Sequence, residues 1–244
     1  MKREVSVLMP AARLTLWKVL GISLLTAGVQ VPLLLAALRG WAQPEELGPP
    51  ALEVIVQQSR ISLVFGAGLL LVCAVLILPG LERGAKTSYT LRRLGVGERA
   101  LVMLWGGLNS MLLLIFWAVQ TAAALAFSQY YFQTTLAGMA NHQTLFLACS
   151  RSPYLHNLLP LWDWPYLLRN LAGGLALGLS AAALPFHWRH GRKGWSFLLL
   201  AVFFAYIPPM MMESSSFASV SILIFVIAYA LITSNVWRRY GDED

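Results

Sequence analysis

The sequence predicts an all-α integral membrane protein with six transmembrane helices. Hydrophobic residues make up 58% of the 244 residues and charged residues only 12%, about half of what soluble domains carry. The hydrophobic residues gather in segments close to the length of about 20 residues that a helix needs to cross a bilayer. Because the bilayer core offers no water to backbone polar groups, segments of this kind must be helical.

The six predicted spans divide the chain without leaving room for a second domain. They cover residues 14–38, 61–81, 100–128, 166–185, 196–212 and 217–236. The last two are separated only by Pro208-Pro209 and by the polar residues 213–216, which predict a short hairpin. A single transmembrane domain over residues 1–244 is therefore expected.

The distribution of Lys and Arg predicts the orientation of these spans. With the N-terminus in the cytoplasm, 14 of the 18 Lys and Arg residues fall in cytoplasmic segments and 4 in outer segments. Because positive residues concentrate on the cytoplasmic side, both termini are predicted to be cytoplasmic in a multi-pass protein of the cell membrane. The net charge of +7 is thus a topology signal, and no nucleic-acid partner is expected.

The basic segment between the second and third spans contains a partial likeness to a phosphate-binding loop. Residues 84–88 read Gly-Ala-Lys-Thr-Ser, but the required spacing is G-x-x-x-x-G-K-[ST] and a strand must precede it. Nucleotide binding by this chain is therefore not predicted. Residues 85–94 contain no Gly or Pro, and Gly95 is a suitable helix stop, so a short cytoplasmic helix is predicted there.

Neither a metal site nor a catalytic site is predicted. Four potential ligands recur every seven residues, at His142, Cys149, His156 and Asp163. Pro153 and Pro160 interrupt any continuous helix, and ligands one heptad apart would be about 10 Å from each other along it. A nucleophile motif and a zinc-protease motif are both absent from the sequence, so the chain is not expected to be an enzyme.

The spans contain neutral polar and small residues that allow two interpretations. Gln30, Asn109 and Gln120 could line a pathway for a partly polar substrate, or they could form hydrogen bonds between helices. Gly174, Gly178 and Ala182 recur every four residues, a pattern that predicts close helix packing within the chain or across a dimer. The long outer segment, residues 129–165, is rich in aromatic residues and is interpreted as an interfacial belt or as a gate.

Two stretches resemble the permease subunit of bacterial ABC exporters, the six-helix type-2 family. "MKREVSVLMPAARLTLWKVL" resembles the family's amphipathic N-terminal helix on the cytoplasmic face, and "GAKTSYTLRRLGVGERALVMLWGG" resembles its coupling helix before the third span. The resemblance implies that two permease chains, identical or different, pair in the membrane and bind two cytoplasmic ATPase subunits. ATP and Mg would bind to those subunits, with no cofactor on this chain.

The same resemblance assigns residues and a function. The contact with the ATPase would involve Lys86, Thr87, Tyr89, Thr90, Arg92 and Arg93. Because the spans contain few charges, the exported substrate is expected to be hydrophobic or amphipathic, such as a lipid, a peptide or a drug. The alternative is a non-transporting membrane subunit that acts as a scaffold or sensor in a signalling or export complex.

Overall fold

A computed structural model describes residues 2–40, 51–81, 97–135, 142–160, 163–191, 193–210 and 215–239, and this part of the chain is helical with no strand. The helices, of which η2 is a 3₁₀-helix, are α1 (Lys2–Arg39), α2 (Leu52–Gln58), α3 (Ile61–Leu76), η2 (Leu78–Gly80), α5 (Glu98–Thr135), α6 (His142–Arg151), α7 (Pro153–Leu158), α8 (Trp164–Arg189), α9 (Trp195–Met210) and α10 (Ser215–Arg239).

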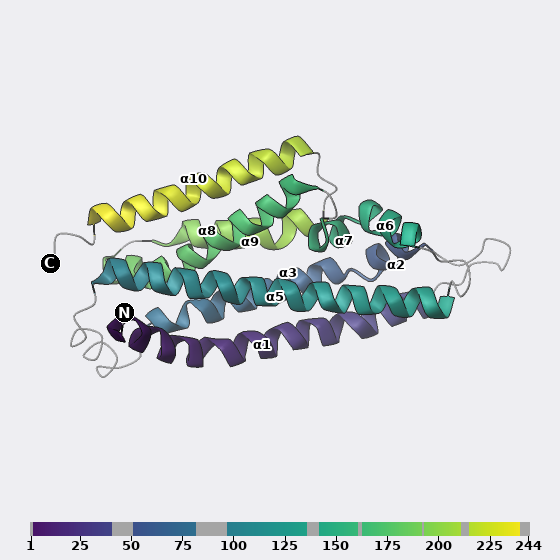
Figure 1. The fold of residues 1–244 in the computed structure, drawn as a ribbon, viewed down its shortest axis with the longest axis horizontal. Helices are drawn as coiled ribbons and strands as arrows, with labels where there is room; N and C mark the ends of the chain where they lie inside the picture. The colour runs from purple at the N-terminus through teal and green to yellow at the C-terminus, as the bar shows by residue number, and fades with distance from the viewer. Residues whose placement is uncertain are drawn as a thin grey trace.

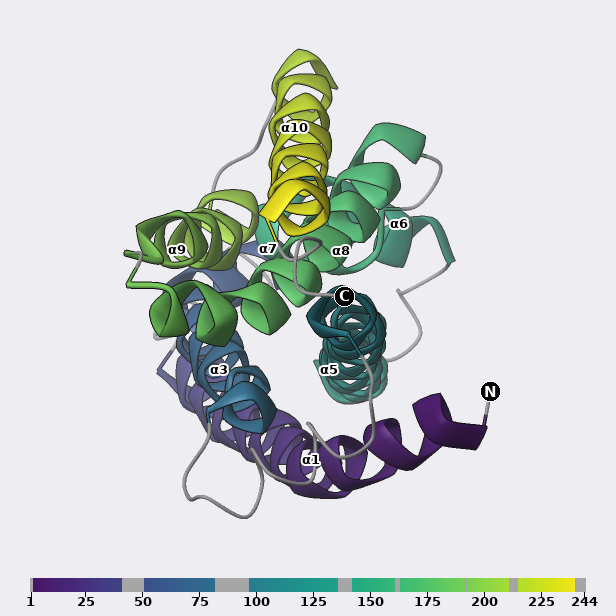
Figure 2. The same ribbon diagram turned by 90° about the vertical axis from the view of Figure 1, so that its left-hand side faces the viewer.

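The long helices form an elongated bundle (Figure 1). Helices α1, α3, α5, α8, α9 and α10 run along the long axis with alternating direction, so that both chain termini lie at one end. The short helices α2, α6 and α7 lie toward the other end. Viewed along the axis, α10 lies at the periphery against α8 (Figure 2).

Five described helices are long and apolar enough to cross a membrane, which indicates a multi-pass membrane protein. These segments are Leu8–Arg39, Ile61–Gly80, Glu98–Thr134, Trp164–Arg189 and Ser216–Arg238. The predicted span at 196–212 corresponds to α9, which is apolar but has only 16 residues. At about 1.5 Å per residue α9 is about 24 Å long, against about 30 Å of hydrocarbon. Six spans are therefore not confirmed by length and composition.

The predicted N-terminal helix is continuous with the first predicted span, because α1 runs without interruption from Lys2 to Arg39. Pro10 and Pro32 lie inside it. Figure 2 shows that its first turns sweep sideways from the rest of the bundle. Both α1 and α5 have 38 residues and are about 57 Å long, so they extend well beyond a bilayer core.

Helix α8 is the central element of the bundle. In its most apolar stretch 72% of the residues are buried, compared with 17% in α10. Helices α8 and α5 pack closely because each has a glycine at the contact. A Cβ on Gly178 of α8 would lie 2.3 Å from Ser110 Oγ, and one on Gly106 of α5 would lie 2.9 Å from Leu179. Gly191, with φ of 71°, ends α8 in the left-handed conformation that glycine adopts readily.

Candidate functional site at the basic end of the bundle

The residues predicted to contact an ATPase all lie outside the described residues. Lys86, Thr87, Tyr89, Thr90, Arg92 and Arg93 belong to the segment 82–96. The structure does describe the two ends from which this segment departs, the η2 turn and the start of α5. Both lie at the same end of the bundle as the two chain termini (Figure 1). We call this end the basic end.

Arg189, in the last turn of α8, joins both ends of the segment 82–96. Its Nη1 lies 3.6 Å from Glu98 Oε1 at the start of α5. Its Nη2 donates a hydrogen bond of 3.4 Å to the carbonyl of Gly80, at the end of η2. The guanidinium also lies over the ring of Phe186, 4.9 Å from its centroid. Because the planar guanidinium has several donors in fixed directions, one Arg can make these contacts together. We call this arrangement the Arg189 clamp.

The backbone at both partners suits the clamp. A Cβ on Gly80 would lie 2.5 Å from Pro185 Cγ, so only glycine lets η2 approach α8 this closely. Glu98 occupies the first turn of α5, where a carboxylate is favoured by the helix dipole. Arg189 occupies the last turn of α8, where a cation is favoured. The dipole of α5 thus stabilises the charge of Glu98, and the dipole of α8 stabilises the charge of Arg189.

A second arginine ties the start of α5 to α10. Arg99 Nη2 donates a hydrogen bond to the carbonyl of Trp237, in the last turns of α10. Its guanidinium lies 5.5 Å from the centroid of the Trp237 ring. The first two residues of α5 therefore contact the final turns of two other spans, through Glu98 and Arg99.

A hydrophobic cluster lies beneath these contacts and joins four helices. Trp105 of α5 and Phe186 of α8 pack with their centroids 5.9 Å apart. The cluster, which we call the basal cluster, consists of Ala11, Leu101, Val102, Trp105, Leu179, Ala182, Ala183, Phe186 and Val236. Because interiors pack densely and transmit strain, a displacement of the start of α5 would be felt by α8 and α10.

The small residues of α8 have different surroundings. Gly178 is pressed against α5, and Ala182 belongs to the basal cluster. A Cβ on Gly174 would meet nothing within 4 Å. Gly174 instead lines an internal cavity among α3, α5, α7, α8 and α9. The Gly174 carbonyl also accepts a hydrogen bond of 3.4 Å from Ser110 Oγ of α5. The structure thus places all three predicted packing residues against a neighbouring helix of the same chain.

The structure buries the three amide residues named for a pathway and places each in a contact between helices. The Tyr154 hydroxyl donates to Gln30 Oε1 over 3.2 Å. Gln120 Nε2 donates to the carbonyl of Ser23 over 2.9 Å. Asn109 Nδ2 reaches two carbonyls, those of Leu76 at 3.4 Å and Gly178 at 3.3 Å. Gln30 lines a small cavity whose lining does not include Asn109 or Gln120, and the pathway role stays a prediction.

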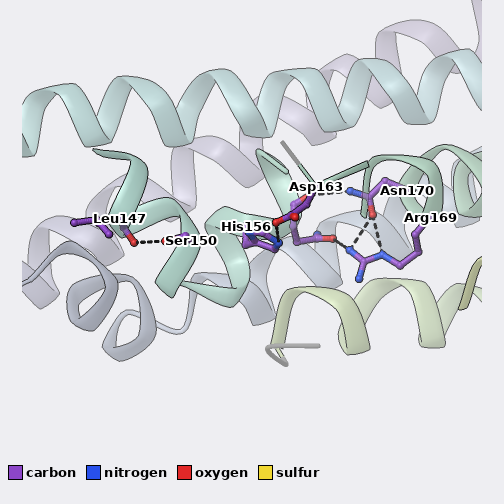
Figure 3. A network of polar contacts seen from close by, with 7 residues as sticks. Leu147, Ser150, His156, Asp163, Arg169 and Asn170 are labelled. Atoms are coloured by element: carbon purple, nitrogen blue, oxygen red, sulfur yellow. Dashed lines mark hydrogen bonds and ion pairs between the residues drawn. The ribbon is translucent and has the colours of Figure 1, made fainter. Parts of the chain in front are cut away.

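At the opposite end, a buried arginine organises a polar network (Figure 3). Arg169 of α8 is only 1% exposed. Its Nη2 donates to Asn157 Oδ1 over 2.5 Å and to Asn170 Oδ1 over 3.1 Å. Asn170 Nδ2 in turn donates to the Asn157 carbonyl over 2.7 Å. The guanidinium also lies 5.1 Å from the centroid of the Tyr166 ring. This network fixes α7 against α8.

His156 and Asp163 extend the same network. His156 Nε2 lies 3.3 Å from Asp163 Oδ2, and the His156 ring packs edge-on against Tyr166. Burial lowers the pKa of His156, and the charge of Arg169 adds to this effect, although Asp163 opposes it. His156 is thus neutral at pH 7. Two of the heptad-spaced residues therefore meet, but among the described residues no group of three potential ligands could hold a metal ion.

The internal cavity lined by Gly174 is small. It encloses about 30 Å³ among apolar side chains such as Phe65, Leu113 and Phe204, with Asn157 and Asn170 among its lining residues. Pockets for drug-sized ligands enclose about 300–1,000 Å³. A substrate of that size therefore does not fit inside this cavity as it stands.

Comparison of the chain with protein-family models, with curated proteins and with solved structures finds no match in any of the three.

Proposed function

We propose that the chain is the permease subunit of an ABC exporter, in which the segment 82–96 receives force from a cytoplasmic ATPase. One observation carries the proposal: the Arg189 clamp joins both ends of this segment to the central helix α8. A loop that only reverses the chain needs no such attachment. A segment that transmits movement does, because force applied to it must reach the spans.

The proposed topology has six crossings, with α9 as the fifth. Helix α9 runs from the basic end toward the opposite end, antiparallel to α8 before it and to α10 after it in the chain (Figure 1). Its length of about 24 Å is short for a full crossing, and a bilayer accommodates such a mismatch by thinning locally. The excess of Lys and Arg supports a cytoplasmic location for the basic end, so that both termini face the cytoplasm in a protein of the cell membrane.

The proposed mechanism follows from the contacts at the basic end. ATP and Mg bind to the partner ATPase, whose closure displaces the segment 82–96. Glu98 and Arg99 pass the displacement to α8 and α10, and the basal cluster couples these helices to α1. Because the cavity lined by Gly174 holds only about 30 Å³, we place the path for a hydrophobic or amphipathic substrate between this chain and a second permease chain.

One observation favours the alternative of a non-transporting scaffold or sensor subunit. Gln30, Asn109 and Gln120 make hydrogen bonds between helices within the chain, as in a membrane domain whose interior is purely structural. The two functions differ in one measurable property. That property is transport: a permease complex moves its substrate across the membrane, and its ATP hydrolysis is faster when the substrate is added. A scaffold or sensor subunit moves no substrate.

The test is purification of the tagged full chain from its native membrane, followed by labelling with a photoreactive ATP analogue. The permease proposal expects a co-purifying ATP-binding subunit, encoded next to this chain and carrying a Walker motif. The variant Tyr89→Ala with Arg93→Glu should lose that subunit. The matched control, Tyr130→Ala with Arg60→Glu, changes exposed residues outside the segment 82–96 and should retain it. Equal recovery from both variants contradicts the docking assignment.

A further inference from the structure

An apolar groove opens beside the last turn of α8, separate from the Arg189 clamp. Its walls come from Ile77 after α3, Leu184 and Trp188 of α8, and Trp195, Phe197 and Leu198 of α9. It encloses about 390 Å³, more than ten times the volume of the internal cavity. This volume falls within the range of sites that hold small molecules.

The sequence produces the groove by the way α8 ends and α9 begins. Gly191 terminates α8 with a positive φ, so the chain turns sharply there. A Cβ on Gly194 would lie 1.8 Å from Leu184 Cδ1, so glycine lets the returning chain pass close to α8 without displacing the Leu184 side chain. Helix α9 therefore starts beside α8 but leaves a hollow between their side chains, next to the end of α3.

The chemistry of the groove is that of the boundary between hydrocarbon and headgroups. Trp188 and Trp195 are 49% and 64% exposed, and tryptophan is enriched at this depth of a membrane. Lys193 is also exposed and lines the groove, and among the described lining residues it is the only charged one. An apolar hollow with a single cation at its edge complements a molecule that has an acyl chain and a negative headgroup.

We propose that this groove binds one anionic phospholipid, with an acyl chain between α8 and α9 and its phosphate beside Lys193. The groove lies at the basic end, and basic pockets between spans at such a membrane face suit anionic headgroups. A zwitterionic lipid has the same acyl chains but adds a positive group, and it binds more weakly. The inference does not depend on the proposed export function.

The test is native mass spectrometry of the detergent-solubilised full chain titrated with dioleoylphosphatidylglycerol or with dioleoylphosphatidylcholine. The wild-type chain is expected to bind the first lipid more tightly. Lys193→Gln should weaken binding of the first lipid by about fivefold, which corresponds to the ~1 kcal/mol of one Lys near an anionic surface. It should weaken binding of the second lipid less, because the choline cation offsets the charge of its phosphate. Leu198→Trp should fill the groove and remove one bound molecule of either lipid.

Two control variants separate the groove from the general lipid-facing surface. Lys18→Gln removes an exposed cation from α1, and Leu199→Trp enlarges a side chain that is 67% exposed and does not line the groove. Both should bind the two lipids as the wild type does. The proposal is overturned if the wild type binds both lipids equally, or if the controls and the groove variants behave alike. If the binding of the anionic lipid is unchanged in Lys193→Gln, the assignment of the phosphate to Lys193 is overturned. The Leu198→Trp variant tests the acyl-chain site separately.

Discussion

The Arg189 clamp can be tested by a double-mutant cycle with Arg189→Gln and Glu98→Gln. The two charges lie 3.6 Å apart, where Coulomb's law gives about 1 kcal/mol in water and about 5 kcal/mol at an effective dielectric constant of 20. Their side chains are 29% and 30% exposed, so solvation and side-chain entropy offset most of the larger value. We expect a coupling free energy of about 1 kcal/mol.

The single variants should differ in a predictable way. Glu98→Gln loses the ion pair alone, about 1 kcal/mol of stability. Arg189→Gln also loses the hydrogen bond to Gly80 and the contact with Phe186, so it should cost about 2 kcal/mol. The double variant should be no less stable than Arg189→Gln, because Glu98 then has no cation there to lose.

Reversible unfolding of the full chain in mixed micelles, at increasing fractions of dodecyl sulfate, measures these differences through tryptophan fluorescence. The pair Arg151–Glu53 is a matched control at the same 3.6 Å, with side chains 66% and 23% exposed. Its coupling should be about 0.5 kcal/mol or less. A coupling at the clamp below that of the control would refute the assignment of Arg189 as the link between η2 and α5.

Three further changes test other parts of the fold by the same unfolding measurement. Gly178→Ala should cost about 1–3 kcal/mol because its Cβ meets α5, whereas Gly174→Ala has open space and should be neutral or stabilising; equal effects would contradict the packing. Arg169→Gln removes a donor from the buried amide of Asn157 and the half-buried amide of Asn170 and should cost about 2–3 kcal/mol, whereas the exposed Arg151→Gln should stay within about 0.5 kcal/mol. Because the pKa of His156 is lowered in the folded protein, the unfolded chain takes up the proton first, so stability should fall as pH drops below about 6.5; His156→Gln should reduce this slope, and an unchanged slope would assign it to other groups.

The sequence was sufficient to predict the helical class and the positions of the five long apolar helices, because segment length and hydropathy determine both. It did not predict where the helices end. Helix α5 continues to Thr135, beyond the predicted limit of residue 128, and α1 begins at Lys2. Hydropathy reports which residues prefer lipid, whereas a helix continues until a residue stops it, and polar residues without Gly or Pro do not stop it.

The contacts at the two polar networks could not be read from the sequence. Arg189 and Arg169 counted only as topology signals, yet one joins η2 to α5 and the other fixes α7 to α8. Their partners are set by which helices lie side by side, and one sequence does not determine lateral packing. One local signal was present for Arg169: it is adjacent to Asn170, so two polar side chains lie together near the start of the predicted span 166–185.

The central claim is that the segment 82–96 contacts an ATPase, and site-specific photocrosslinking in intact cells tests it most directly. A benzophenone amino acid placed at Tyr89 should capture a cytoplasmic polypeptide that also labels with a photoreactive ATP analogue. The same group at Tyr130, on α5 outside that segment and 49% exposed, should not capture it. Capture of that polypeptide from neither position, or equally from both, would contradict the account.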